Sequence, residues 1–522
     1  MRSVPDRVRR AALAAAIVVT AGFLAGCGKS EQPVGGSAVV AMPTPPDSLD
    51  PQVAYSTEAA EADWIAYTPL LTYRHNNGAD GTELIPGLAL RLPRISPEGR
   101  RYDFALRDGL VYSNGEPVKA SDFEHAIERA LVLNWPGERF ITENVVGAQS
   151  YDRGRARQIS GITADDVTGK LSIKLIRPNG SFANVLGLPA TAPVPSSTPM
   201  RDLSATPPPG VGAYRITDVS PGRRWTMVKN PRFAGAGIPD IPLGNLDRIV
   251  VKVEPDARSA ISKVLRGRAD GFDPATPLPA GTRARAASAG DRFEFVPIPS
   301  TLYFYLDTAE PPFSSELARR AVVTALDRPA LARLGKQAVV PDCYLIPPGI
   351  TGHPTDDCPY GDADGTGDPH AGRQLVEQSG TEGAPVTVSV DDNWPQPAYG
   401  RYFAKLLTRL GFDANLRIAR TRPAGAANTR GVTSQAGFAS WFNDFPAPMD
   451  FFAVLDPRGI ERPGSANAGR VRDPFIKQQL EKLSLVPPQD LSTTSGDWRD
   501  LDEYAAKKAY LRFSAPSRCR NW

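Results

Sequence analysis

Residues 386–419, VTVSVDDNWPQPAYGRYFAKLLTRLGFDANLRIA, contain the pattern that decides the fold class. Alternating apolar residues over 386–390 predict a strand, and apolar residues at helical spacing follow over 397–410. Gly411 is a typical helix stop, and a second strand is expected over 414–419. Two strands joined by a helix in this way favour parallel pairing, so we expect an α/β protein.

The rest of the chain continues this mixture of strands and helices, without an internal repeat of fixed period. Its 522 residues are enough for two or three domains. Ser56 or Thr57 is the expected cap of the first helix, and Ser121 that of the second. Strands are expected over 38–42, 101–107, 170–176, 213–219, 224–229, 248–254, 293–298 and 301–307, and helices over 56–71, 121–133, 256–267, 315–327 and 329–336.

The N-terminus has the pattern of a bacterial lipoprotein signal. Four arginines precede the apolar run 11–24, which is too short to span a bilayer as a stable helix. The sequence LAGC at 24–27 resembles a lipobox, in which the cysteine is acylated after cleavage before it. We therefore predict a signal peptide over 1–26, lipidation at Cys27 and a polar tether over 27–37. The alternative is an ordinary secretory signal with a chance cysteine.

Composition and charge restrict the partners of the chain. Hydrophobic residues make up 41% and charged residues 22%, which is ordinary for a globular protein. The formal net charge is +3, and removal of residues 1–26 would leave a chain that is close to neutral. This balance argues against a nucleic acid partner. No later segment reaches the roughly 18 apolar residues of a membrane span.

Two of the four cysteines flank a loop rich in proline and glycine. In an oxidising compartment we expect Cys343 and Cys358 to form a disulfide across this loop, which would stabilise the fold by about 3 kcal/mol. The alternative is two free thiols. Cys519 then has no partner left.

Sequence motifs of catalysis are absent. The chain has no G-x-S-x-G, no G-x-x-x-x-G-K-[ST] and no H-E-x-x-H. His353 and His370 flank the acidic stretch 356–368, but a calcium loop counted from Asp362 would place Arg373 where a carboxylate is needed. We therefore expect a solvated acidic loop, no catalytic residues, no metal site and no cofactor.

Seven stretches, taken in order, resemble a known family. Each is weak alone, but together they cover nearly the whole chain after the signal. They are PDSLDPQ (46–52), LIPGLA (84–89), YDFALRDGLVYSNGEPVKASDFEHAIERAL (102–131), PGVGAYRITDVSPGRRWTMVKNPRF (209–233), LDRIVVKVEPDARSAISKVLRGRADGF (246–272), LYFYLDTAEPPFSSELARRAVVTALDRPAL (302–331) and SWFNDFPAPMDFF (440–452). The chain resembles the extracellular solute-binding proteins of family 5, the peptide-type receptors of ABC importers.

The resemblance implies a two-lobed, type II periplasmic-binding-protein fold with an extra subdomain and a ligand cleft between the lobes. It places hinge strands near 297–302 and near 500. Mapped onto this chain, lobe one comprises 38–70, 190–298 and 501–522, the extra subdomain 71–189, and lobe two 299–500.

The resemblance also implies how a ligand is held. In peptide-binding members, main-chain hydrogen bonds hold an extended peptide, and an aspartate of a W-x-x-D segment holds its α-ammonium group. Here Asp444 is that aspartate, and Trp441 supplies an aromatic wall. The alternative is that Asp444 caps a turn before Pro446 and that Trp441 is core. Weaker lining candidates are Tyr55, Ser56, Tyr303, Tyr305, Trp394 and Asn443.

The implied partners are a peptide, a membrane permease and its ATPase, with a monomeric receptor tethered by lipid outside the cytoplasm. Some positions depart from the family pattern: Phe445 replaces a usual tyrosine, Ala447 replaces a second aspartate, and the C-terminal region 505–522 is shorter than is usual in the family.

Two alternatives stay open. The same fold could bind a metal chelate, an oligosaccharide or an opine-like compound, or the protein could be a surface sensor.

Overall fold

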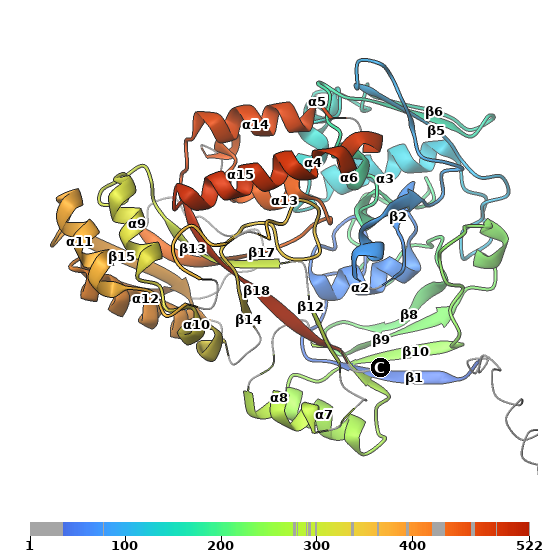
Figure 1. Ribbon diagram of the computed structural model, residues 1–522. Helices are drawn as coiled ribbons and strands as arrows, with labels where there is room; N and C mark the ends of the chain where they lie inside the picture. Colours follow the sequence, from blue (N-terminus) through green and yellow to red (C-terminus); the bar gives the residue numbers. More distant parts are fainter. Residues whose placement is uncertain are drawn as a thin grey trace, which may run out of the picture.

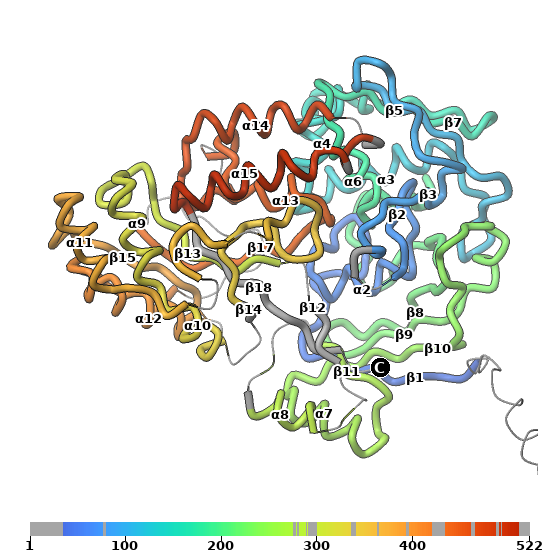
Figure 2. Tube along the Cα trace, viewed as in Figure 1, coloured from blue at the N-terminus to red at the C-terminus, as the bar shows by residue number. Residues whose placement is uncertain are grey.

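The computed structural model describes residues 35–520 apart from 77, 275–277, 279, 289, 291–293, 298–299, 336–338, 356, 363–364, 393–395, 420–433, 461–464 and 487. The predictions for Cys27, Trp394, the signal peptide and residues 27–34 of the tether concern residues outside this description. Figure 2 follows the chain in colour from its N-terminal strand to its last helix. Among the described residues, no helix is both long and apolar enough to cross a membrane.

Two large sheets organise the molecule at its two ends (Figure 1). We call the part around the first sheet the first lobe and the part around the second sheet the second lobe. The first sheet has the order β11 (Gly271–Phe272), β1 (Ser37–Met42), β10 (Arg248–Val253), β9 (Arg224–Lys229), β8 (Tyr214–Ser220). The second has the order β12 (Glu294–Pro297), β18 (Leu511–Arg520), β13 (Ser300–Leu306), β17 (Ala436–Phe442), β15 (Pro385–Asp391), β16 (Asp413–Ala419), with β14 (Val339–Pro341) paired to β18.

The β-α-β unit that opened the sequence analysis is present. β15 and β16 pair in parallel, with Val388 opposite Leu416, and α12 (Gln396–Leu410) connects them. Gly411 has a φ of +104°, a left-handed conformation that favours glycine and ends the helix. Alternate valines of β15 are buried against α12, so the period-two pattern of 386–390 marks the buried face as predicted. The α/β fold class is confirmed.

The second-lobe sheet is covered by helices on both faces. Along β13, Leu302, Phe304 and Leu306 pack into one hydrophobic cluster, and Tyr303 packs into the other. One face is covered by α9 (Glu316–Thr324), α10 (Arg328–Leu334), α11 (Pro369–Ser379) and α12, and the other by α13 (Pro448–Phe451), α14 (Pro474–Ser484) and α15 (Ser495–Lys507). Cys343 and Cys358 are joined by a disulfide, with Cα atoms 5.8 Å apart, in the segment between α10 and α11.

The first-lobe sheet also separates two layers. α2 (Thr57–Ala66) lies on one side, and α7 (Ala257–Leu265) and α8 (Ala280–Ala287) lie on the other (Figure 1). On β1, Met42 packs into the large first-lobe cluster and Ala41 packs under α7 and α8. The helix α2 ends at Ala66, five residues before the predicted end, because Pro69 disfavours helical backbone in the residue before it.

A four-stranded antiparallel sheet extends the first lobe within the region 71–189. It has the order β4 (Arg94–Ile95), β5 (Arg101–Ala105), β7 (Lys170–Lys174), β6 (Ile162–Asp165), and its residues share one hydrophobic cluster with the first-lobe sheet. Beside it lie β2 (Leu71–Tyr73), β3 (Leu84–Pro86), α3 (Ala120–Val132), α4 (Arg139–Thr142), α5 (Ala148–Asp152) and α6 (Phe182–Val185). Short 3-10 turns span Gly78–Thr82, Pro189–Thr191, Phe233–Ala236, Phe452–Leu455, Pro457–Gly459 and Pro488–Thr494.

The predicted cap of α3 was wrong. The N-cap is Lys119, whose backbone N–H donates to the Asp122 carboxylate over 2.8 Å. Ser121 lies inside the helix, and its hydroxyl donates to Asp166 over 2.8 Å instead. The helix begins at Ala120, one residue before Ser121. The Asp122 carboxylate in the first turn accepts the Lys119 N–H, and this hydrogen bond makes Lys119 the N-cap.

One long strand, β18, pairs with both β12 and β13 of the second sheet. β18 pairs antiparallel with β12 at its C-terminal end, where Glu294 lies opposite Arg520, and with β13 at its N-terminal end, where Tyr305 lies opposite Leu511. The predicted crossing near 297–302 spans the end of β12 and the start of β13, and it stays a prediction. The predicted crossing near 500 falls inside α15, whose Leu501 packs in the second lobe, and the chain returns along β18 instead. Residues 501–507, which the sequence assigned to lobe one, thus lie in the second lobe.

Candidate functional site

The segment that follows β17 connects the two lobes. Phe445 and Ala447 leave the second-lobe sheet and are buried in the hydrophobic cluster of the first lobe. The Phe445 ring lies 5.7 Å from the ring of Phe140. Elsewhere the Gly180 N–H donates to the Ser484 carbonyl over 2.8 Å. The residues between β17 and α13 therefore sit where the lobes meet.

Asp444 and Tyr55 form a hydrogen bond across this junction. The Tyr55 hydroxyl donates to Asp444 Oδ1 over 2.7 Å. Tyr55 is held from its own lobe, because the Asp47 carboxylate accepts its backbone N–H over 3.0 Å and its ring meets Trp135 edge-on at 6.0 Å. Ser56 caps α2, where its hydroxyl accepts the Ala59 N–H over 3.2 Å. The sequence candidates Tyr55 and Asp444 thus meet, although 389 positions separate them.

A second carboxylate, Asp450, holds the Asp444 loop in shape. Asp450 is 3% exposed and lies on α13. Its Oδ2 accepts the Trp441 indole N–H over 3.1 Å and the Asp444 backbone N–H over 2.9 Å. The side chain of Asp444 has Tyr55 as its only hydrogen-bond partner among the described residues. Asp450 therefore stabilises the turn, whereas the Asp444 side chain makes no hydrogen bond within the turn among the described residues.

Sequence reasoning missed Asp450. The available signal was an acid within the apolar run PMDFF, where burial demands hydrogen-bond partners. The other candidates are spread out. Trp441 and Asn443 are partly buried beside Asp444, and Tyr305 is within 3.1 Å of the Ser434 hydroxyl. Tyr303 is 3% exposed and packs in the core of the second lobe, because its position on β13 faces α14 and α15.

The electrostatics of the two aspartates favour a cation. Burial raises the pKa of Asp444 to about 6, and the hydrogen bond from Tyr55 opposes this rise. Burial, followed by the charge of Asp444, raises the pKa of Asp450 well above its usual range. Within the described part of the chain, no lysine, arginine or histidine forms an ion pair with either carboxylate. At neutral pH the pair therefore carries negative charge that nearby described side chains do not compensate.

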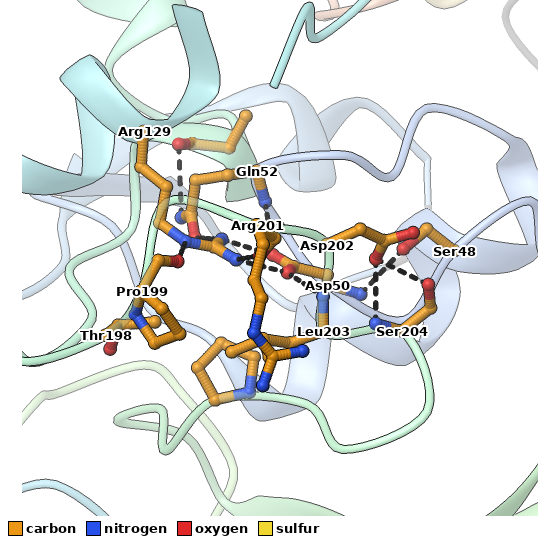
Figure 3. A network of polar contacts seen from close by, with 12 residues as sticks. Ser48, Asp50, Gln52, Arg129, Thr198, Pro199, Arg201, Asp202, Leu203 and Ser204 are labelled. Atoms are coloured by element: carbon orange, nitrogen blue, oxygen red, sulfur yellow. Dashed lines mark hydrogen bonds and ion pairs between the residues drawn. The ribbon is translucent and has the colours of Figure 1, made fainter. Parts of the chain in front are cut away.

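A second acidic site in the first lobe is fully compensated. The Asp50 carboxylate accepts two charge-assisted hydrogen bonds from Arg129, of 2.6 and 2.5 Å, and both side chains are fully buried. Figure 3 shows the remaining guanidinium N–H groups directed at Gln52 and at the carbonyls of Pro199 and Arg201. The motif SLDPQ thus forms a structural clamp between α3 and the Pro-rich segment that includes Leu203.

Burial of an acid alone does not define a site. Asp502 is fully buried on α15 and accepts the backbone N–H groups of Leu345 and Ile346 over 2.8 to 3.0 Å. Burial raises its pKa to about 8, so it is largely neutral at pH 7. Asp444 differs because it keeps partial exposure and lies between two lobes.

The predicted acidic loop offers no metal site in its described part. Among the described residues, no three or more histidine, cysteine or acidic side chains form a group that could hold a metal ion. The His353 Nδ1 lies 2.7 Å from the Ile346 carbonyl, which fixes the imidazole to the backbone.

Comparisons with known proteins identify the family of the chain and its relatives. Residues 83–459 match the family described as bacterial extracellular solute-binding proteins, family 5. A probable deoxycholate-binding periplasmic protein of Escherichia coli K12 is 25% identical over 59% of this chain and 56% of that protein. A glutathione-binding protein of Shigella dysenteriae is 25% identical over 72% of this chain and 66% of that protein. The chain thus spans between 56% and 66% of the length of these curated relatives.

Solved structures match over almost the full length. An oligopeptide-binding protein of clavulanic acid biosynthesis has a TM-score of 0.84 at 21% identity and covers 94% of this chain and 91% of its own. The ABC transporter-associated periplasmic binding protein DppA of Helicobacter pylori, in complex with the peptide STSA, has a TM-score of 0.71 at 20% identity, with 94% of this chain and 95% of that chain covered. The two-lobed, type II fold predicted from the sequence is therefore confirmed.

Proposed function

The chain belongs to the bacterial extracellular solute-binding proteins of family 5, and on that premise we propose that it binds peptides through their free α-ammonium group. The ligand site would lie between the lobes at Asp444, with Trp441 and Tyr55 beside it. The receptor would deliver its ligand to a membrane permease driven by an ATPase. The solved relative that carries a bound peptide supports this substrate class.

One observation carries the proposal: Asp444 is a carboxylate at the lobe junction without a cation among the described residues. A buried carboxylate and an ammonium compensate each other, and each alone is costly in a desolvated site. Asp450 completes the arrangement, since it holds the Asp444 backbone and the Trp441 indole in place. A peptide N-terminus would supply the missing positive charge.

The proposal includes a hinged closure and a membrane tether. The two lobes would separate along β12, β13 and β18, and ligand would favour closure by binding the closed state more tightly. The extra subdomain over 71–189 would move with lobe one. We further propose that Cys27 is acylated and holds a monomeric receptor at the outer face of the cytoplasmic membrane.

A blocked peptide terminus tests the function directly. We would compare the binding of tetra-alanine with that of N-acetyl tetra-alanine by isothermal titration calorimetry at pH 7.5. We expect the free peptide to bind and the acetylated peptide to bind at least about 100-fold more weakly, because a desolvated carboxylate–ammonium pair is lost. A peptide amidated at its C-terminus serves as the control and should keep most of its affinity.

Equal affinity for the free and the acetylated peptide would contradict the ammonium anchor. Binding of an oligosaccharide, a metal chelate or an opine-like compound, with no binding of any peptide, would assign the same fold to a different solute. One relative is named for binding deoxycholate, a bile acid without an amine group. A bile acid should therefore be among the solutes tested.

A further inference from the structure

A cavity lined by positive charge lies on the outer side of the first lobe, away from the lobe junction. It is lined by α7, by the segment that follows α7 and by Arg285 of α8, and its volume is about 340 Å³. Figure 1 shows α7 and α8 below the five-stranded sheet. The lining of the cavity consists of charged and hydroxyl side chains: Asp256, Arg258, Ser259, Ser262, Lys263, Arg266, Arg268 and Arg285. Five cations thus surround one small hollow.

The positive charge in this hollow is poorly compensated. The one lining carboxylate, Asp256, is the N-cap of α7 and accepts the backbone N–H groups of Arg258 and Ser259 over 3.1 and 3.2 Å. Lys263 forms an ion pair with Glu254. The four lining arginines have no carboxylate within ion-pairing distance in the part of the chain that the structure describes.

Helix stability does not explain this arrangement. Cations in the last turn of a helix interact favourably with its dipole, which accounts for Lys263 near the end of α7. Arg258 lies in the first turn, where the dipole disfavours a cation. Arg268 and Arg285 come from the segment after α7 and from α8. Arginines from separate segments therefore converge on one hollow, although like charges repel each other there.

We propose that this α7–α8 pocket binds a phosphate group. The planar guanidinium forms paired hydrogen bonds to phosphate oxygens, and the hydroxyls of Ser259 and Ser262 add neutral donors at the same wall. The phosphate could belong to the headgroup of an anionic phospholipid or to free phosphate or pyrophosphate. This site differs from the Asp444 site in both its place and the sign of its charge.

The test uses two probes and a charge-matched control. Inorganic pyrophosphate is titrated calorimetrically in about 50 mM salt, and flotation measures binding to phosphatidylglycerol vesicles against phosphatidylcholine vesicles. The test variant R266Q/R268Q removes two exposed pocket arginines. The control R153Q/R155Q removes two exposed arginines of the region 71–189, near α5 at the opposite end of the molecule in Figure 1. Surface changes of this kind have little effect on folding.

We expect the protein to bind at least one probe, with affinity that falls as salt rises. R266Q/R268Q should weaken this binding about tenfold or more, and R153Q/R155Q should leave it unchanged. Pyrophosphate binding without a vesicle preference would identify a free phosphate compound. A preference for phosphatidylglycerol that R266Q/R268Q abolishes would identify a lipid headgroup.

Absence of binding to both probes, or equal losses in the two variants, would overturn the proposal. Peptide affinity should be the same in R266Q/R268Q and in the unaltered protein. The proposal for the α7–α8 pocket and the proposal for the Asp444 site can therefore be refuted independently of each other.

Discussion

Two acidic centres of this molecule, Asp50 and Asp444, differ in whether a described cation pairs with the carboxylate. Asp50 is fully buried and is matched by Arg129, whose five N–H groups all have acceptors (Figure 3). Asp444 has one hydroxyl partner, Tyr55, and no described cation. The first centre is complete within the chain, whereas the second has no positive charge paired with it among the described residues.

This difference separates an acid that stabilises the fold from the acid that we propose binds the ligand. A compensated ion pair at Asp50 holds α3 and the SLDPQ motif in one arrangement, and a ligand would have nothing to add there. The uncompensated Asp444 lies where the two lobes meet, so a cation from outside would join the lobes as it binds. We expect substitutions at the first centre to affect folding and substitutions at the second to affect binding.

The largest effect should follow from Arg129→Met. This change leaves Asp50 buried without its cation, so the free energy of unfolding should fall by about 3–5 kcal/mol. Denaturant-induced unfolding followed by circular dichroism measures it. Arg139→Met is the control, because Arg139 pairs with Glu143 near the surface and should contribute less than about 1 kcal/mol. A loss at Arg129 no larger than that of the control would show that the clamp is not structural.

The next effect should appear with Asp444→Asn, which keeps the shape and removes the charge. The affinity for a free-amine peptide should fall about 100-fold or more, since the ammonium loses its carboxylate. Stability at pH 7 should stay equal or rise by up to about 2 kcal/mol. The folded pKa lies above the usual value of 3.8, so ionisation of Asp444 costs stability that the amide does not.

Calorimetry and thermal unfolding of the same samples measure the two consequences of Asp444→Asn. A variant that unfolds more easily and keeps its peptide affinity would reverse the assignment of the two centres.

The sequence predicted the fold well where local patterns decide it. The strand–helix–strand unit over 385–419 follows from periodicity and from Gly411, which act over a few residues. The cap of α3 was mispredicted, because residue type alone suggested Ser121 while chain geometry selected Lys119. The C-terminal crossing was placed too early, since β18 forms only by pairing with distant β12 and β13.

The arrangement of the candidate site was predictable only in part. Asp444 and Trp441 came from a short motif, but Asp450 and the bond to Tyr55 depend on how the chain folds back and on contact between lobes. The Asp50–Arg129 pair joins residues 79 positions apart. The near-neutral overall charge concealed the basic α7–α8 pocket, because composition averages over surfaces that only the fold separates.

A smaller, graded effect should come from pH. Below about 6 Asp444 is protonated in the free protein, so the affinity for a free-amine peptide should fall about tenfold for each further pH unit. Above about 8 the peptide ammonium loses its proton, and the affinity should fall again. Titrations from pH 5 to 9 measure this profile, and Asp444→Asn should remove its acid limb. A flat profile between pH 7 and 5 would mean that a different group binds the amine.

The smallest effect should follow from Tyr55→Phe, which deletes the hydroxyl that donates to Asp444. That hydrogen bond holds the pKa of Asp444 down, so its loss should shift the acid limb of the binding profile toward higher pH. At pH 7.5 the affinity should change by less than about fivefold, because one hydrogen bond contributes roughly 1 kcal/mol. Tyr151→Phe is the control, since its hydroxyl has no hydrogen bond to another described residue. An unshifted acid limb in Tyr55→Phe would show that Tyr55 does not contact Asp444 in the peptide-binding state, and that the junction rearranges before ligand enters.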